Sequence, residues 1–233
     1  MKKLKRHTVE ENLEFILNKN SPEEIVKQYR ITAKNLIKLM ENRERKAVVI
    51  TSPNIGEGKS LSCVNIAKAL ADLGKSVLVI DANIRAPYIH CLYGLPNDEG
   101  LTSVLSHRNF PAATVSNKIF AISSGPKIED TPSHLRGENM RKLIKSSEDW
   151  YDYILIDTPD LSKEDALVMG SFTAGILLVI RENYTKHPDL IKSVRKIKNS
   201  GGTLIGLLKV GCTNGQLIPK KHKKVKKVKE KVK

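Results

Sequence analysis

One short stretch constrains the fold of this chain more than any other. An apolar run ends at Thr51, a turn containing Gly56 and Gly58 follows, and an amphipathic segment opens with Lys59 and Ser60. This order predicts a strand, a loop and a helix, which is the context that a phosphate-binding loop requires. Glycines let successive backbone N–H groups point at phosphate oxygens, and the helix start adds its dipole. The alternative is an ordinary tight turn before a helix.

Each residue type in this stretch has a use if the loop holds a nucleotide. The ammonium group of Lys59 would reach the β- and γ-phosphates, and the hydroxyl of Ser60 would bind Mg²⁺. The strict pattern has a glycine where this chain has Pro53. The nucleotide-binding residues expected here are Gly56, Glu57, Gly58, Lys59, Ser60 and Leu61.

The rest of the chain alternates apolar runs with helical patterns. We expect further strands at 76–81, 119–123, 152–157, 174–180 and 203–209, and helices at 59–73, 101–106, 133–148, 162–170 and 186–199. We interpret the remainder of 88–117 as turn-rich. Strands that alternate with helices predict an α/β fold with a doubly wound, mainly parallel sheet covered on both faces. Ligands of such sheets bind at the carboxyl ends of the strands.

Two of the predicted strands end in an aspartate, Asp81 and Asp157. A nucleotide triphosphate with Mg²⁺ needs a backbone cradle, a lysine, a hydroxyl ligand and acidic residues behind the metal. We therefore expect Lys59, Asp81 and Asp157 to be catalytic, and Ser60 with the two aspartates to hold the metal. The alternative for each aspartate is a polar cap on a strand end. Arg85 could contact phosphate, a neighbouring subunit or a surface carboxylate.

Two helical patterns precede this core. Thr8 and Glu11 form a capping box before a short periodic stretch at 9–17, and Ser21-Pro22 starts a second helix that runs to about Glu41. These helices either pack on the flank of the core or mediate self-association. We expect an N-terminal helical segment at 1–44, a P-loop ATP-binding domain at 45–215 and a lysine-rich tail at 216–233.

The positive charge of the chain is unevenly placed. Residues 220–233 hold nine lysines and one glutamate, so this stretch carries eight of the fifteen net positive charges. A tail without aromatic or bulky apolar side chains cannot bury enough surface to fold, so we expect it to be disordered. It could contact an anionic membrane, nucleic acid or another polyanion, or it could be a solvated tail that aids solubility.

The compartment is predicted from what the sequence lacks. No uninterrupted apolar run approaches the ~18 residues of a membrane span, and the basic N-terminus has no apolar segment after it that would make a secretory signal. Cys63, Cys91 and Cys212 are too few and too widely spaced for a disulfide framework or a metal site. We therefore expect reduced thiols and a cytoplasmic location.

At these residues the chain resembles the bacterial tyrosine kinases of capsular and exopolysaccharide operons. These kinases belong to the deviant P-loop ATPases, which also include division-site and plasmid-partition proteins. The resemblance covers about residues 21–210 and is carried mainly by 50–60, 78–87, 95–101 and 151–159. The turn at Asn83-Ile-Arg85-Ala-Pro87 and the absence of a lysine in the turn before Lys59 favour the kinases over their partition relatives.

The resemblance implies an enzyme that uses ATP and Mg²⁺ to phosphorylate tyrosine on itself and on other proteins. It implies a membrane-anchored polysaccharide co-polymerase or adaptor as partner, a homo-oligomer, a peripheral position at the inner face of the membrane, and regulation of polysaccharide chain length and export. Carried over by position, Asp81 and Asp157 support the metal or the attacking hydroxyl, and Arg181 and Lys209 join the nucleotide-binding residues.

Three departures from the family pattern keep other functions open. Asn83 stands where the family has a second aspartate, and an amide cannot accept a proton as a base. Lys209 stands where an asparagine is expected to read the adenine, and the family's C-terminal tyrosine cluster is absent, Tyr184 being the last tyrosine. The alternatives are a nucleotide-binding regulator with little transfer activity and a positioning ATPase of the partition type.

Overall fold

The computed structural model describes residues 16–107, 112–128, 134, 135 and 137–211. Most of the predicted helix at 9–17 and all of the lysine-rich tail at 216–233 lie outside these residues. The described end of that predicted helix, Ile16 and Leu17, is not helical. Instead, the Leu17 backbone N–H donates to the Asn65 side chain at 2.8 Å, so this segment lies against the core.

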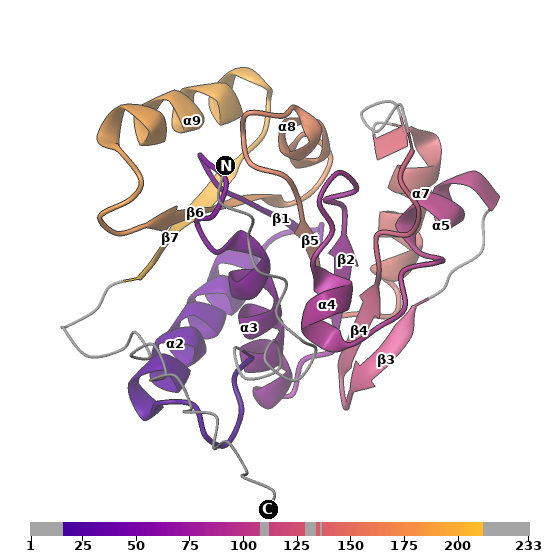
Figure 1. Cartoon of the computed structure of the whole chain (residues 1–233), viewed down its shortest axis with the longest axis horizontal. Coiled ribbons are helices and arrows are strands. Elements are labelled where there is room, and N and C mark those ends of the chain that lie inside the picture. The colour runs from indigo at the N-terminus through magenta and orange to yellow at the C-terminus, as the bar shows by residue number, and fades with distance from the viewer. Residues whose placement is uncertain (1–15, 108–111, 129–133, 136, 212–233) are drawn as a thin grey trace, which may run out of the picture.

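A seven-stranded sheet forms the centre of the molecule (Figure 1). Its spatial order is β3-β4-β2-β5-β1-β6-β7, and every neighbouring pair is parallel except β3 with β4. The strands are β1 (Ala47–Thr51), β2 (Val77–Asp81), β3 (Ala113–Ser116), β4 (Ile119–Ile122), β5 (Tyr153–Asp157), β6 (Gly175–Arg181) and β7 (Leu204–Val210). The predicted doubly wound, mainly parallel α/β fold is confirmed.

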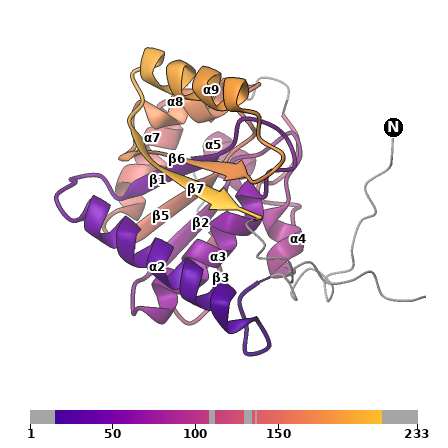
Figure 2. The same ribbon diagram turned by 90° about the vertical axis from the view of Figure 1, so that its left-hand side faces the viewer.

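Helices cover both faces of this sheet, as Figure 2 shows from the side. One face is covered by α2 (Glu23–Met40), α3 (Lys59–Asp72) and α4 (Ile89–Tyr93). The other is covered by α5 (Leu101–His107), α7 (Glu138–Ser147), α8 (Asp165–Gly170) and α9 (His187–Asn199). Neighbouring residues of one strand enter opposite cores, for example Val48 and Val49 of β1. This is why the central strands are apolar throughout instead of alternating.

The helix before the core packs on its flank. Ala33, Leu36 and Met40 of α2 are buried in the same cluster as the apolar face of α3. α2 begins at Glu23, one residue later than predicted, and Pro22 occupies the position before the first helical turn. Of the described residues, none lies in a helix that is long and apolar enough to span the hydrocarbon layer of a membrane.

Three predicted elements need correction. The stretch at 88–117 holds α4 and β3 as well as the predicted α5; both added elements are short, and alternate residues of β3 are only half-buried. Within the helix predicted at 133–148, the continuous helix among the described residues is Glu138–Ser147. The helix predicted at 162–170 begins at Asp165 because the preceding residues form a turn in which the Asp160 carboxylate accepts the Ser162 N–H at 2.9 Å.

Candidate active site

The loop between β1 and α3 has the backbone that a phosphate cradle requires. Gly56 and Gly58 have φ angles of 83° and 84°, in the left-handed region that side chains with a Cβ rarely adopt. Gly58 is the last residue before α3, and its carbonyl accepts the Ser62 N–H at 2.8 Å to start the helix. Lys59 and Ser60 are therefore the first residues of the helix, where the N–H groups and the dipole favour an anion.

The Glu57 side chain shapes this loop from within. It is fully buried, and its carboxylate accepts the Asn54 N–H at 3.0 Å and the Thr185 hydroxyl at 2.6 Å. The side chain is thus engaged with protein groups, which leaves the backbone N–H as the part of Glu57 that could contact phosphate. The partner from the β6–α9 connection is not predicted by the sequence, because Thr185 lies 128 residues further along the chain.

The carboxyl end of β6 supports the outer side of the loop. Arg181 donates through Nη1 to the Gly56 carbonyl at 3.2 Å, and the Tyr184 hydroxyl donates to the Ile55 carbonyl at 3.1 Å. Lys209 of β7 lies further out, with its Nζ 2.6 Å from Glu182 Oε1. The structure thus brings Arg181 to the loop, while Lys209 is tied to a carboxylate at the exposed end of the neighbouring strand.

Asp81 and Asp157 lie directly opposite one another at the ends of β2 and β5. Both are completely buried, and burial raises the pKa of Asp81 to about 6 and that of Asp157 to about 7. The positive charge of Lys59 opposes this rise in both pKa values, and the charge of Asp81 adds to the rise at Asp157. The charge of Lys59 therefore acts on both carboxylates that the sequence predicts for the site.

The two carboxylates differ in their partners. Asp81 accepts three backbone N–H groups at 3.0–3.1 Å, from Asn83, Tyr88 and Ile89. Neither carboxylate oxygen of Asp157 has a hydrogen-bond partner among the described residues, although the Ser60 hydroxyl is near enough to lower its pKa. A buried carboxylate is costly without a partner. Oxygen ligands of this kind suit Mg²⁺, so Ser60 and Asp157 fit the predicted metal site.

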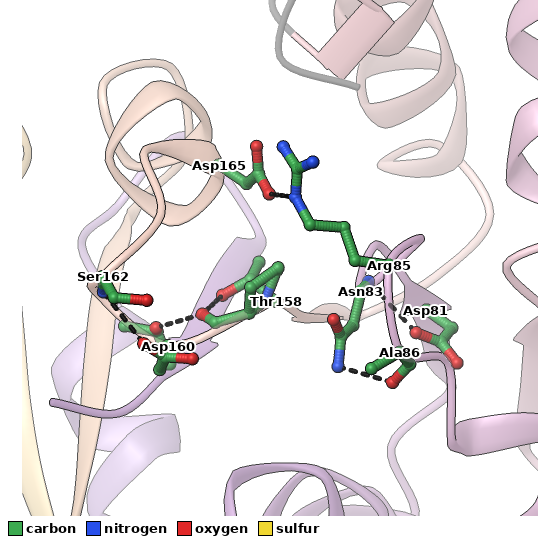
Figure 3. Close-up of polar contacts among 10 residues, drawn as sticks. Asp81, Asn83, Arg85, Ala86, Thr158, Asp160, Ser162 and Asp165 are labelled. Carbon is green, nitrogen blue, oxygen red and sulfur yellow. Dashed lines mark hydrogen bonds and ion pairs between the residues drawn. The ribbon is translucent and has the colours of Figure 1, made fainter. Parts of the chain in front are cut away.

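The turn after β2 places further polar groups near Asp81 (Figure 3). Arg85 Nε lies 3.5 Å from Asp165 Oδ2, and the Asp165 side chain is fully buried at the start of α8. Burial raises the pKa of Asp165, and the guanidinium of Arg85 opposes that rise. The sequence left phosphate, a neighbouring subunit or a surface carboxylate as possible partners of Arg85. The structure shows an ion pair with a carboxylate that is buried instead of lying on the surface. The sequence gives no signal for Asp165 beyond an acidic first turn.

Asn83 lies in the same turn with its side chain largely committed. Its backbone N–H donates to Asp81, and its Nδ2 donates to the Ala86 carbonyl at 2.7 Å. These two bonds close the turn between the strand end and Arg85. The amide therefore has a structural role at the position where a carboxylate could have titrated.

Comparison with known sequences identifies the relatives of this chain. A family model described as ParA: NUBPL iron-transfer P-loop NTPase matches residues 43–225. The chain is 33% identical over 189 residues to the tyrosine-protein kinase YwqD of Bacillus subtilis, covering 79% of this chain and 80% of YwqD. It is 25% identical over 187 residues to the putative tyrosine-protein kinase CapB of Staphylococcus aureus, covering 78% and 82%.

Solved structures agree with these relatives. The kinase domain of the Escherichia coli tyrosine kinase ETK superposes with a TM-score of 0.76 at 25% identity, covering 79% of this chain and 74% of that domain. The chimerical protein CapA2B2 gives 0.77 at 25% identity, covering 85% and 89%. The septum site-determining protein MinD of Pyrococcus horikoshii, at 0.58 and 22% identity, shares the fold. The chain belongs to the ParA-type P-loop NTPases and, among them, to the bacterial protein-tyrosine kinases.

Proposed function

We propose that this chain transfers the γ-phosphate of ATP to tyrosine, with Mg²⁺, in a capsular or exopolysaccharide system. The observation that carries the proposal is the pair of buried carboxylates beside Lys59, with both oxygens of Asp157 unpartnered among the described residues. A cation held by Ser60 and Asp157 would supply the missing partner. The names of the relatives, tyrosine-protein kinases from two species, support the same reaction.

The loop and Lys59 would bind and orient the triphosphate. Phosphoryl transfer needs little covalent chemistry from the protein, so positioning and electrostatic stabilisation supply most of the rate. The N–H groups at the start of α3 would hold the β-phosphate, and the ammonium group of Lys59 would lie between the β- and γ-phosphates. Bound Mg²⁺ would neutralise the charge that develops on the phosphate oxygens.

Asp81 would act as a fixed negative charge next to this centre. Its three backbone hydrogen bonds hold the carboxylate in one orientation and oppose the rise in its pKa that burial causes. A carboxylate held in this way is preorganised to orient a water ligand of the metal or the attacking hydroxyl. Asp81 is therefore proposed as a positioning group whose position does not depend on the nucleotide.

Arg181 and Lys209 are proposed to contact the nucleotide from the opposite rim. Arg181 already touches the loop at Gly56 and carries further guanidinium donors that could reach phosphate. Lys209 would have to exchange its bond with Glu182 for a bond with the nucleotide. Because this lysine is more than half exposed, that exchange requires little rearrangement.

A second candidate function is a nucleotide-binding regulator with little transfer activity. The Asn83 amide favours it, because it cannot take a proton and is bound to the Ala86 carbonyl. The sequence also has no tyrosine after Tyr184 that could be an autophosphorylation site in the tail. This candidate shares the nucleotide site and differs in the expected product.

The proposal extends to partners and location. We propose a membrane-anchored co-polymerase or adaptor as partner, and the relative solved as the chimerical protein CapA2B2 supports a two-component system. We also propose a homo-oligomer at the inner face of the membrane, with the lysines of 216–233 contacting anionic lipid or another polyanion. We further propose that the chain divides into an N-terminal helical segment at 1–44, a catalytic domain at 45–215 and the lysine-rich tail.

One experiment separates these functions. The chain is incubated with γ-labelled ATP, Mg²⁺ and a glutamate–tyrosine copolymer, and phosphotyrosine and free phosphate are measured. We expect phosphotyrosine from the wild type and none from Lys59→Ala or Asp157→Asn. The control Asp149→Asn changes an exposed carboxylate that precedes β5, at the end of the strand opposite Asp157, and should behave like the wild type. ATP binding with neither product would favour the regulator. Phosphate release that DNA or vesicles stimulate would favour a positioning ATPase.

A further inference from the structure

Transfer to tyrosine requires a destination for the phenol proton, and this inference rests on the proposed kinase function. A tyrosine phenol has an ordinary pKa of about 10 and is neutral at physiological pH. Its proton must leave as its oxygen bonds to phosphorus. A positioned base speeds such a step by about 10²–10⁴-fold. A carboxylate with an unengaged oxygen near the nucleotide loop would meet this need.

Most of the polar groups around the site are already engaged. Asp81 accepts three backbone N–H groups, and Asp165 is buried against Arg85. Asp157 lies beside Lys59 and Ser60, where it suits the metal. Asn83 is an amide and cannot serve as a base. None of these four offers a carboxylate oxygen that an incoming hydroxyl could reach without competing with another group.

Asp160 differs from these groups. Its side chain lies just after β5, three residues beyond Asp157, and the residue is only 6% exposed. One carboxylate oxygen accepts the Ser162 N–H at 2.9 Å, and no contact with the described residues engages the other. Figure 3 shows Asp160 and Asn83 on either side of Thr158, with the Arg85–Asp165 pair above them. A largely buried carboxylate, with one oxygen that no described residue engages, therefore lies just after β5, across Thr158 from Asn83.

The backbone around Asp160 is fixed to the start of the phosphate loop. The Pro159 carbonyl accepts the Thr51 hydroxyl at 2.7 Å, and the Leu161 N–H donates to the Ser52 carbonyl at 2.9 Å. Asp160 lies between these two attachments. Hydrogen bonds on both sides therefore set the position of Asp160 relative to the nucleotide loop. A residue that acts on the hydroxyl accepting the γ-phosphate has to be held in place in this way.

We propose that Asp160 accepts the proton of the acceptor tyrosine. The tyrosine O–H bond breaks, and the proton passes to the free carboxylate oxygen of Asp160. The tyrosine oxygen forms a bond to the γ-phosphorus, the bond from that phosphorus to the β,γ-bridging oxygen breaks, and ADP leaves with the electron pair. Asp160 then releases its proton to water. In this chain the Asp160 carboxylate after β5 accepts the proton, which the amide of Asn83 cannot do.

The test compares Asp160→Asn with the wild type on two acceptor peptides. One contains tyrosine and the other contains tetrafluorotyrosine, whose more acidic phenol needs a base less. We expect Asp160→Asn to lower transfer to tyrosine by about 100-fold and to recover most of that loss on the fluorinated peptide. ATP affinity should stay within a factor of about two, because the proposed role begins after nucleotide binding. Asp160→Glu, which keeps a carboxylate, should retain more activity than Asp160→Asn.

Three outcomes would overturn the inference or the function behind it. Asp160→Asn with wild-type transfer rates would remove Asp160 from the mechanism while leaving the kinase function intact. An equal loss on both peptides, or the same loss in Asp160→Glu, would show a structural role for the turn and overturn the inference as well. A wild type that phosphorylates neither peptide would overturn the proposed kinase function. Asp149→Asn serves as the matched control, and thermal melting verifies that each variant is folded.

Discussion

The substitution Asp157→Asn should stabilise the nucleotide-free protein at neutral and alkaline pH, although it removes a proposed metal ligand. Burial raises the pKa of Asp157 from an ordinary 3.8 to about 7. Between these two values the folded protein keeps a proton that the unfolded chain has lost. Stability is therefore fullest below the unfolded pKa and falls as the pH rises to the folded pKa, after which the loss is complete. The amide of the variant does not titrate and escapes this loss.

The magnitude follows from the shift. One pKa unit corresponds to 1.36 kcal/mol, and about two units of the shift lie between pH 5 and the folded pKa. The wild type should therefore lose about 3 kcal/mol relative to Asp157→Asn between pH 5 and pH 8. In a chain of this size, 1 kcal/mol moves the melting temperature by roughly 2–4 °C. The difference in melting temperature should grow by about 6–12 °C over this range.

The assay is thermal or urea unfolding of both proteins at pH 5 and pH 8, without nucleotide or metal. Asp81 also titrates in this range in both proteins. The change in the difference between the two proteins from pH 5 to pH 8 therefore reports the ionisation that the variant lacks, because the hydrogen-bonding deficit of a buried amide is present at both pH values. Added ATP and Mg²⁺ should then raise the melting temperature of the wild type and leave that of the variant unchanged. A stability difference that is the same at pH 5 and pH 8 would refute the account of this carboxylate.

Three further predictions concern other parts of the molecule. Gly58→Ala should destabilise the protein by about 1–2 kcal/mol and weaken ATP binding in calorimetry, because φ is 84° there; unchanged stability would contradict the strained turn. Arg85→Ala should cost about 3 kcal/mol in urea unfolding at pH 8, whereas Asp165→Asn should cost under about 1 kcal/mol, because only the first leaves a buried charge unpaired; equal losses would contradict this asymmetry. Deleting 216–233 should leave ATP affinity unchanged and weaken salt-sensitive binding to anionic vesicles; vesicle binding at the wild-type level would exclude the tail from that role.

The sequence predicts best what neighbouring residues determine. The apolar runs, the two glycines of the loop and the aspartates at strand ends follow from spacing and side-chain type, and Asp81 and Asp157 lie at matched positions of adjacent strands. Short elements such as α4 and β3 are missed because they are too short for a periodic pattern to show. Their boundaries depend on packing against the rest of the fold.

Partners that are distant in the chain are what the sequence does not supply. In the sequence, Glu57 looks like an ordinary acidic residue in a loop. Its hydrogen bond with Thr185 depends on how β6 lies beside β1. Asp165 looks like an acidic residue in a first helical turn, and only the fold brings Arg85 to it. In both cases the side chain is charged and buried, which composition and periodicity cannot reveal.

The bonds from Arg181, Tyr184 and Thr185 to the phosphate loop have a consequence for how nucleotide affinity can evolve. These contacts come from the end of β6 and from the connection between β6 and α9, more than 100 positions away from the glycines. A substitution there can lower or raise the affinity for a triphosphate while the sequence of the phosphate loop stays the same. Relatives with identical loops can therefore differ widely in how strongly they hold ATP, and the reason would lie in a peripheral connection that a search for the motif never inspects.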